Sequence, residues 1–162
     1  MHLTKTTVGA IAALALVPSV ALAATINGGP GNERLKGTRF ADHIDGNAGN
    51  DRILGLAGDD VLIGGPGNDR IAGGRGNDDI SGVQGNDRLF GGPGDDTLLG
   101  GAGADRIGGG AGRDTLVGGN GNDRISARDG EVDRIACGRG RDFVVADRID
   151  SVSRDCERVR RG

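Results

Sequence analysis

The sequence is poor in aromatic residues, cysteine and histidine. Only 2% of its 162 residues are aromatic, with neither Trp nor Tyr, and it contains two Cys and two His. The two cysteines and His43, the one histidine beyond the N-terminal segment, cannot supply the four ligands of a Cys/His zinc site. The shortage also argues against nucleophilic catalysis, because a Ser or Cys nucleophile needs a base beside it.

Long apolar runs are missing too, apart from one at the N-terminus. Residues 8–17 are largely apolar, follow Lys5 and precede Pro18 and an Ala-Leu-Ala tripeptide ending at Ala23. This order is typical of a secretory signal peptide, and the run is shorter than the ~20 residues that span a bilayer. We expect cleavage after Ala23, no membrane span, and a secreted chain that meets an oxidising, calcium-containing extracellular medium.

Glycine, in contrast, is abundant and regularly spaced. The 34 glycines belong mostly to a nine-residue unit that repeats eleven times without insertion over residues 28–126, as in "GGPGNDRIAGGRGNDDIS". Numbered from Gly28, position 1 is Gly in all eleven units, and position 4 is Gly in all but one, which has Phe40. Position 6 is Asp in all but one, which has Glu33, and position 8 is always Leu or Ile. Such self-similarity predicts a solenoid.

Each position of the unit has a physical role. Positions 1 to 6 predict a tight turn, because glycine permits positive φ and close backbone approach. Positions 7 to 9 predict a three-residue strand with one inward aliphatic side chain between two outward ones. Two such units would form one 18-residue coil, giving an all-β, parallel β-roll. Its thin core would consist of the position-8 residues: Leu35, Ile44, Ile53, Leu62, Ile71, Ile80, Leu89, Leu98, Ile107, Leu116 and Ile125.

This core is too thin to fold the chain unaided, because one aliphatic side chain per nine residues does not offset the entropy of ordering the backbone. The position-6 carboxylates would also stack with like charge, one per coil, about 4.8 Å apart. A divalent cation between successive turns would compensate for the thin core and neutralise the stacked carboxylates. Carboxylate and carbonyl oxygens in a flexible loop suit Ca²⁺ better than Mg²⁺ or a soft metal.

The unit GGxGxDxLx, as in "GGPGNDRIA", "GGRGNDDIS" and "GGNGNDRIS", resembles the RTX (repeat-in-toxin, haemolysin-type) calcium-binding nonapeptide. The resemblance covers residues 28–126 and implies that position-6 aspartates bridge calcium ions between turns 18 residues apart, with carbonyls of the Gly-rich turns completing the shell. Eight such pairs imply about eight ions. The residues implied as ligands are Asp42, Asp51, Asp60, Asp69, Asp78, Asp87, Asp96, Asp105, Asp114 and Asp123.

Both ends of the repeat depart from the pattern. Thr38 and Phe40 replace glycine in the turn before Asp42, so the N-terminal coil is expected to bind calcium weakly. After a roll over residues 24–126, residues 127–162 contain an insertion near Glu131, with Ile135 and Val144 at inward positions. We interpret them as degenerate repeats and a cap. Cys137 and Cys156 are predicted to form a disulfide there.

The sequence predicts no enzyme. Its GxG strings recur every nine residues without a following helix or a GK[ST] motif, so the repeat explains them.

Position 7 on one face forms an arginine column: Arg34, Arg52, Arg70, Arg88, Arg106 and Arg124. The column is either a solvated stripe or a surface for a polyanion or cell-surface component; no specific nucleic acid is implied.

The opposite face carries Val61, Ile63, Leu99 and Val117, which favour either self-association or simply strand formation. Two functions stay open for the whole chain. One is a calcium-stabilised extracellular structural or adhesive module, and the other is a calcium-dependent polyanion-binding module that uses the arginine column.

Overall fold

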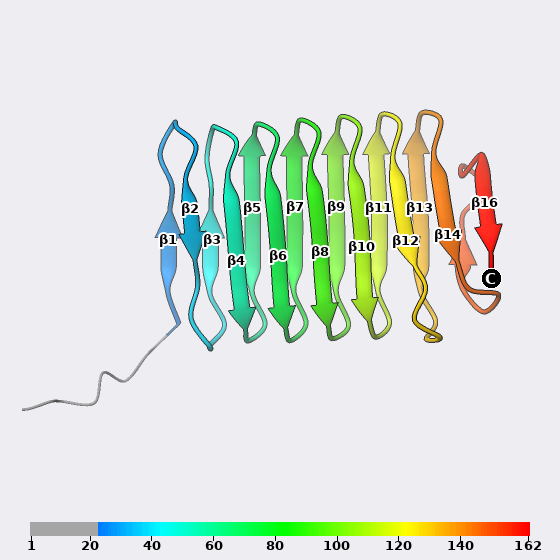
Figure 1. Ribbon diagram of the computed structural model, residues 1–162, viewed down its shortest axis with the longest axis horizontal. Helices are drawn as coiled ribbons and strands as arrows, with labels where there is room; N and C mark the ends of the chain where they lie inside the picture. The colour runs from blue at the N-terminus through cyan, green and yellow to red at the C-terminus, as the bar shows by residue number, and fades with distance from the viewer. Residues whose placement is uncertain (1–22) are drawn as a thin grey trace, which may run out of the picture.

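The computed structural model describes residues 23–162, so the predicted signal peptide lies outside the described residues except for Ala23. The described part forms sixteen strands and no helix, arranged as two parallel sheets that face each other along one long axis (Figure 1). One sheet consists of β1 (Thr25–Asn27), β3 (His43–Asp45), β5 (Val61–Pro66), β7 (Asp79–Gln84), β9 (Thr97–Ala102), β11 (Thr115–Asn120), β13 (Arg134–Arg139) and β15 (Ser151–Val152). The other consists of β2 (Arg34–Lys36), β4 (Arg52–Ala57), β6 (Arg70–Arg75), β8 (Arg88–Pro93), β10 (Arg106–Ala111), β12 (Arg124–Ala127), β14 (Phe143–Ala146) and β16 (Arg158–Arg161).

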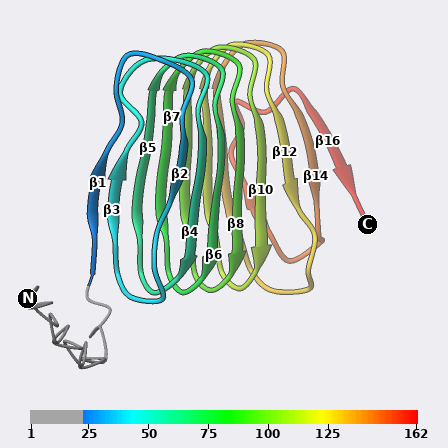
Figure 2. The same cartoon turned by 60° about the vertical axis from the view of Figure 1, so that its left-hand side comes forward.

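The chain alternates between the two sheets, so each coil contains two nonapeptides (Figure 2). Ile44 pairs with Leu62, and Leu62 pairs with Ile80, each a step of 18 residues. The predicted parallel β-roll of 18-residue coils is therefore confirmed. The described residues include no helix of the length and hydrophobicity of a membrane span.

The strands are longer than predicted. The full-length strands, such as β6 and β8, have six residues instead of three, because each continues through positions 1 to 3 of the next unit. Position 2 has positive φ where the strand bends, as at Gly74 (φ 122°) and Gly92 (φ 126°). Leu56 (φ 90°) and Val83 (φ 79°) adopt the same conformation, which is strained for residues with a side chain.

The core is a double row of aliphatic side chains between the sheets. Position-8 residues from Ile44 to Ile125 are at most 3% exposed, and Ile135 and Val144 extend the rows into the C-terminal region. Leu35 is only partly buried, because it lies in the first coil and has a neighbouring coil on one side only.

The C-terminal region continues the roll with an altered register. Thr115 pairs with Arg134 across 19 residues, which places the predicted insertion in the turn before β13. Cys137 and Cys156 form the predicted disulfide, which ties β13 to the segment before β16. The cap is thus built from shortened repeats and a covalent link.

Candidate metal centre

The position-6 aspartates lie in two columns, one along each edge of the roll where the chain turns between the sheets. All ten predicted ligands are at most 3% exposed. The columns alternate along the sequence, so Asp60, Asp78 and Asp96 share one edge, whereas Asp69 and Asp87 share the other. A carboxylate that immediately precedes a strand is thereby placed inside the turn instead of in solvent.

One oxygen of each carboxylate joins successive coils. The backbone N–H of Asp60 donates to Oδ1 of Asp78 at 2.9 Å, and the N–H of Asp78 donates to Oδ1 of Asp96 at 2.8 Å. On the other edge, the N–H of Asp69 donates to Oδ1 of Asp87 at 2.8 Å. Each hydrogen bond spans 18 residues, so the aspartates are coupled along their own edge.

The other oxygen, Oδ2, is buried and has no hydrogen-bond partner. A buried carboxylate oxygen without a donor is costly, and such a group calls for an explanation such as an ion. The same orphaned oxygen recurs in eleven residues, nine of them predicted ligands. They are Asp51, Asp60, Asp69, Asp78, Asp87, Asp96, Asp105, Asp114, Asp123, Asp133 and Asp142.

The space beside Oδ2 exists because position 1 is glycine. A Cβ atom on Gly46 would lie 2.5 Å from Oδ2 of Asp51 and 2.6 Å from the carbonyl oxygen of Gly64. A Cβ on Gly118 would meet Oδ2 of Asp123 at 2.5 Å and the carbonyl oxygen of Cys137 at 2.6 Å. A carboxylate oxygen of one coil and a carbonyl oxygen of the next coil therefore converge on one small space.

This donor set fits a hard cation. Every donor is an oxygen, and Ca²⁺ takes six to eight oxygens, including carboxylates and backbone carbonyls. Among residues 23–162, no group of three or more His, Cys, Asp or Glu side chains is placed to hold a metal ion. Backbone carbonyls of the turns must therefore supply much of any coordination shell.

Burial shifts the acidity of the columns in the metal-free chain. Removal from water, together with a smaller contribution from neighbouring carboxylates of the same column, raises the pKa of Asp60, Asp87 and Asp123 to about 6. The pKa of Asp96 rises to about 7 for the same reasons, with Asp78 and Asp114 as its charged neighbours. The ionised columns are electrostatically costly unless a cation is present.

The first coil differs from the others, as the sequence suggested. The backbone N–H of Thr38 donates to Oδ2 of Asp42 at 2.5 Å, and the Thr38 hydroxyl donates to Oδ1 at 3.0 Å. This turn therefore supplies its own hydrogen-bond donors where the other turns leave Oδ2 free. Weaker calcium binding by this coil stays a prediction.

Both columns continue beyond Asp123, where the nine-residue spacing predicts no further ligands. Asp133 and Asp142 have the same buried, unpartnered Oδ2, and the columns end at Asp150 and Glu157, which accept from the N–H groups of Asp133 and Asp142. The signal was an Asp two residues before each inward aliphatic, at Ile135 and Val144.

The arginine column lies on the outer face of the sheet that contains β2 to β16. All six of its arginines are exposed, and they pair strand by strand, as Arg70 does with Arg88 and Arg106 does with Arg124. The apolar residues Val61, Ile63, Leu99 and Val117 lie on the opposite sheet, in β5, β9 and β11. The roll therefore separates a cationic face from a partly apolar one.

Comparison with known proteins supports the metal assignment. A search of curated proteins gives no match to this chain. The family model described as the RTX calcium-binding nonapeptide repeat (4 copies) matches residues 27–62, 45–80, 54–89, 81–116 and 108–144. These overlapping matches cover most of the 162-residue chain, including nearly all of the two aspartate columns. The chain thus belongs to the RTX calcium-binding nonapeptide repeat family.

Proposed function

We propose that this chain is an extracellular structural module that folds around calcium ions held in its Gly-rich turns. Membership of the RTX family and the β-roll fold identify a calcium-binding structural module, a type of unit that is not catalytic. The observation that carries the proposal is the buried, unpartnered Oδ2 of nine of the ten predicted ligands, most of which lie beside a carbonyl oxygen of the next coil.

The proposed ligands are the ten predicted aspartates, paired 18 residues apart. Nine of them would bind the ion through the unpartnered Oδ2, while Oδ1 keeps its hydrogen bond to the preceding coil, as in Asp78 with Asp60. Asp42 is the exception, because its Oδ2 already accepts from the Thr38 N–H. The bound ion would supply the positive charge that the turn lacks. About eight pairs result. Asp133 and Asp142 would add one pair each, because their Oδ2 is also buried and unpartnered and their Oδ1 accepts from the N–H of Asp114 and of Asp123.

The expected behaviour is calcium-driven folding, because a metal site built by the fold makes binding energy into folding energy. Circular dichroism of the mature chain should show little β-structure in EDTA and a cooperative gain during a calcium titration. Equimolar Mg²⁺ should fail, because it dehydrates reluctantly and demands octahedral geometry. An EDTA-insensitive β-spectrum would contradict the proposal.

Secretion is the second component of the proposal. Proteins with RTX repeats are typically secreted, and the apolar segment ending at Ala23 suits export. Mass spectrometry of the protein recovered from culture medium should find an N-terminus at Ala24. Recovery of the uncleaved chain from the cell pellet alone would contradict it.

A specific observation favours polyanion binding as an additional function. Among residues 23–162 the ion pairs are Arg113 with Asp95 and Arg128 with Asp147. The arginine column therefore keeps six uncompensated charges in one row. Self-association through Val61, Leu99 and Val117 has no comparable observation in its favour and stays a prediction.

A further inference from the structure

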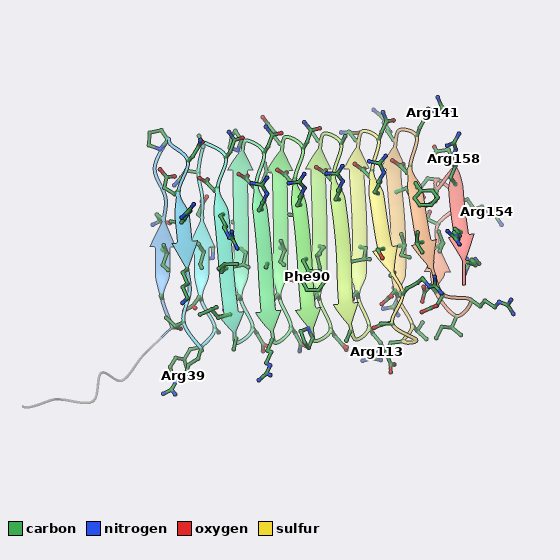
Figure 3. All side chains as sticks on the ribbon, in the orientation of Figure 1. Arg39, Phe90, Arg113, Arg141, Arg154 and Arg158 are labelled. Atoms are coloured by element: carbon green, nitrogen blue, oxygen red, sulfur yellow. A yellow bond between two sulfur atoms is a disulfide. The ribbon has the colours of Figure 1, made fainter. Side chains whose placement is uncertain are left out.

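The sheet that bears the arginine column is entirely free of negative charge. Its eight strands contain no Asp or Glu, from the Arg-Leu-Lys of β2 to the Arg-Val-Arg-Arg of β16. Adjacent arginines are one strand spacing apart, about 4.8 Å. Figure 3 shows nitrogen-tipped side chains in a row across this sheet. A solvated face needs charges of no particular sign, whereas this face presents only one.

An apolar groove runs beside the arginine column. Phe90 is 53% exposed and pairs with Gly108, and a Cβ atom on Gly108 would lie 3.4 Å from the Phe90 ring. The floor continues through Ser126 to Val145, with Phe143 at its far end. A cavity of about 390 Å³ lies over Gly108, Ser126, Val145 and Phe143, and Arg88, Arg106 and Arg124 also line it. Phe90 lies beside this cavity, on the strand next to Gly108.

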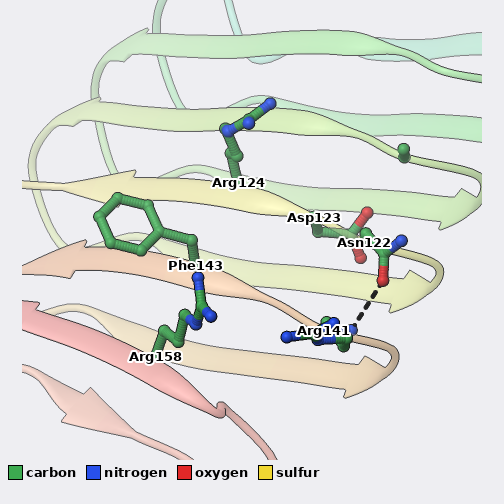
Figure 4. A pocket seen from close by; sticks show the side chains of 7 residues that line it. Asn122, Asp123, Arg124, Arg141, Phe143 and Arg158 are labelled. Carbon is green, nitrogen blue, oxygen red and sulfur yellow. Dashed lines mark hydrogen bonds between the residues drawn. The ribbon is translucent and has the colours of Figure 1, made fainter.

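A second cavity, of about 480 Å³, ends the arginine column. There Phe143 takes the place of an arginine, between Arg124 and Arg158. Arg141 enters from the preceding turn, where its backbone N–H donates to Oδ1 of Asn122 at 2.9 Å (Figure 4). Three cationic side chains thus surround one exposed ring.

The arginine column and the apolar groove together indicate which class of ligand this face can bind. Guanidinium groups in a straight row match a linear polymer with regularly spaced carboxylates or sulfates. Duplex nucleic acid presents a charge every ~1.7 Å, about three times denser than this row. Single strands bind on closely spaced aromatic platforms, whereas the rings here are three strands apart, in β8 and β14. A flat apolar floor between the rings instead suits the CH face of a sugar ring.

We infer that the outer face of this sheet binds a linear anionic polysaccharide along the roll axis, with its acidic groups on the arginine column and its sugar rings on the Phe90–Gly108–Phe143 floor. This inference rests on the proposed polyanion function and narrows it. The ligand would cross the strands, so each coil contributes one cation to the same continuous site.

The test compares two sulfated polymers on the calcium-saturated protein: dextran sulfate, which has sugar rings, and poly(vinyl sulfonate), which has none. Isothermal titration calorimetry should show tighter binding of dextran sulfate, and salt should weaken this binding steeply. Phe90→Ala should weaken dextran sulfate binding by about tenfold, the scale of one stacked ring, and leave poly(vinyl sulfonate) binding unchanged. The control is Phe40→Ala, which removes a ring that stacks on Arg39 in the first coils, away from the groove.

A second set of variants tests the charges. The first variant changes Arg70, Arg88 and Arg106 together to Gln. Its affinity for both polymers should fall by at least about tenfold, because each polymer loses three charge-assisted hydrogen bonds. The control changes Arg39, Arg148 and Arg154 to Gln, with the same change in net charge. Calcium-driven folding, followed by circular dichroism, should be unaltered in both triple variants.

The outcomes distinguish a failure of polyanion binding from a failure of the polysaccharide assignment. Failure of the calcium-saturated protein to bind either polymer would overturn polyanion binding altogether. Equal affinity for both polymers with no effect of Phe90→Ala would leave polyanion binding in place and overturn the polysaccharide assignment. Preference for single-stranded DNA over dextran sulfate would also overturn that assignment.

Discussion

At position 1 of the repeat, glycine is needed for its small size. None of the eleven position-1 glycines has positive φ, whereas most glycines at positions 2 and 4 do. At position 1, the space that a Cβ would fill is occupied by the carboxylate of the same turn and, in nine of the eleven units, also by a carbonyl of the next coil. The repeat therefore uses one residue type for two physical reasons: room at position 1 and backbone conformation at positions 2 and 4.

Gly100 at position 1 and Gly108 at position 9 of the same nonapeptide test the need for space at position 1. A methyl group on Gly100 would meet Oδ2 of Asp105 and lie 2.5 Å from the carbonyl of Gly118, so Gly100→Ala should cost about 1–3 kcal/mol by overpacking. Gly108→Ala would make an ordinary 3.4 Å contact with Phe90 and should be nearly neutral. The calcium concentration at the folding midpoint should rise for the first variant alone. Equal midpoints would refute the role assigned to position 1.

Asp78→Asn tests the pairing of ligands across 18 residues. Asp78 is coupled to Asp60 and Asp96 and has no hydrogen bond to Asp69 or Asp87, its neighbours in the repeat. Asp78 is proposed to share one ion with Asp60 and a second ion with Asp96. The substitution removes a carboxylate from both sites, so about two ions should be lost. Calcium occupancies in a crystal of the variant measure this. Loss of metal between Asp69 and Asp87, with the other sites intact, would show the pairing to be wrong.

At the scale of strands, the period of the roll could be predicted and the length of its elements could not. The position-8 aliphatics fix inward positions every nine residues, and a side chain that must be buried determines the register. Glycine permits positive φ and close backbone approach, so the sequence predicts a turn at Gly73-Gly74. Parallel pairing with β4 nevertheless extends β6 through this pair. Asp133 and Asp142 were missed because the insertion near Glu131 breaks the nine-residue count.

The stacked strands also predict how the metal-free chain responds to acid. Burial raises the pKa of Asp96 to about 7 and that of Asp60, Asp87 and Asp123 to about 6, from an ordinary value of 3.8. The folded state therefore binds protons more tightly than the unfolded state. The stabilisation is complete below about pH 4 and is lost as pH rises through 6 to 7.

In EDTA, lowering the pH from 8 to 5 should therefore increase the β-structure seen by circular dichroism. Saturating calcium should maintain the β-structure at pH 7 to 8, where the metal-free chain has lost it, because the bound ion compensates the ionised carboxylates. A metal-free chain that loses β-structure on acidification over this range would contradict the assigned burial of the columns.

At the scale of the whole molecule, the two columns have a direction. Each coil donates an N–H to a carboxylate of the following coil, so the last donors need an acceptor from outside the repeat. Asp150 and Glu157 provide it, only 17 and 15 residues after Asp133 and Asp142. The Cys137–Cys156 disulfide holds this shortened segment in place. The cap is specific to the C-terminal end of the roll.

The alternation of nonapeptides between two sheets makes the roll sensitive to whether its repeat count is odd or even. Deleting residues 73–90 would remove one coil, shorten the axis by about 4.8 Å and leave Arg70 beside Arg106 in an unbroken column. Deleting residues 73–81 alone would move every later unit to the opposite sheet. Arg88, Arg106 and Arg124 would then follow Val61, and the cationic face would be divided between two sides of the molecule.

Both deletions keep an aliphatic row and an aspartate at every turn, so both should still fold with calcium. Only the nine-residue deletion should abolish the salt-sensitive binding of dextran sulfate, although it removes no residue of the arginine column. The longer deletion removes Arg88 and Phe90 and should weaken this binding without abolishing it. Titration of the two variants side by side measures this, and equal affinities would contradict it. Gain and loss of repeats can therefore preserve the binding surface of this protein only in steps of two.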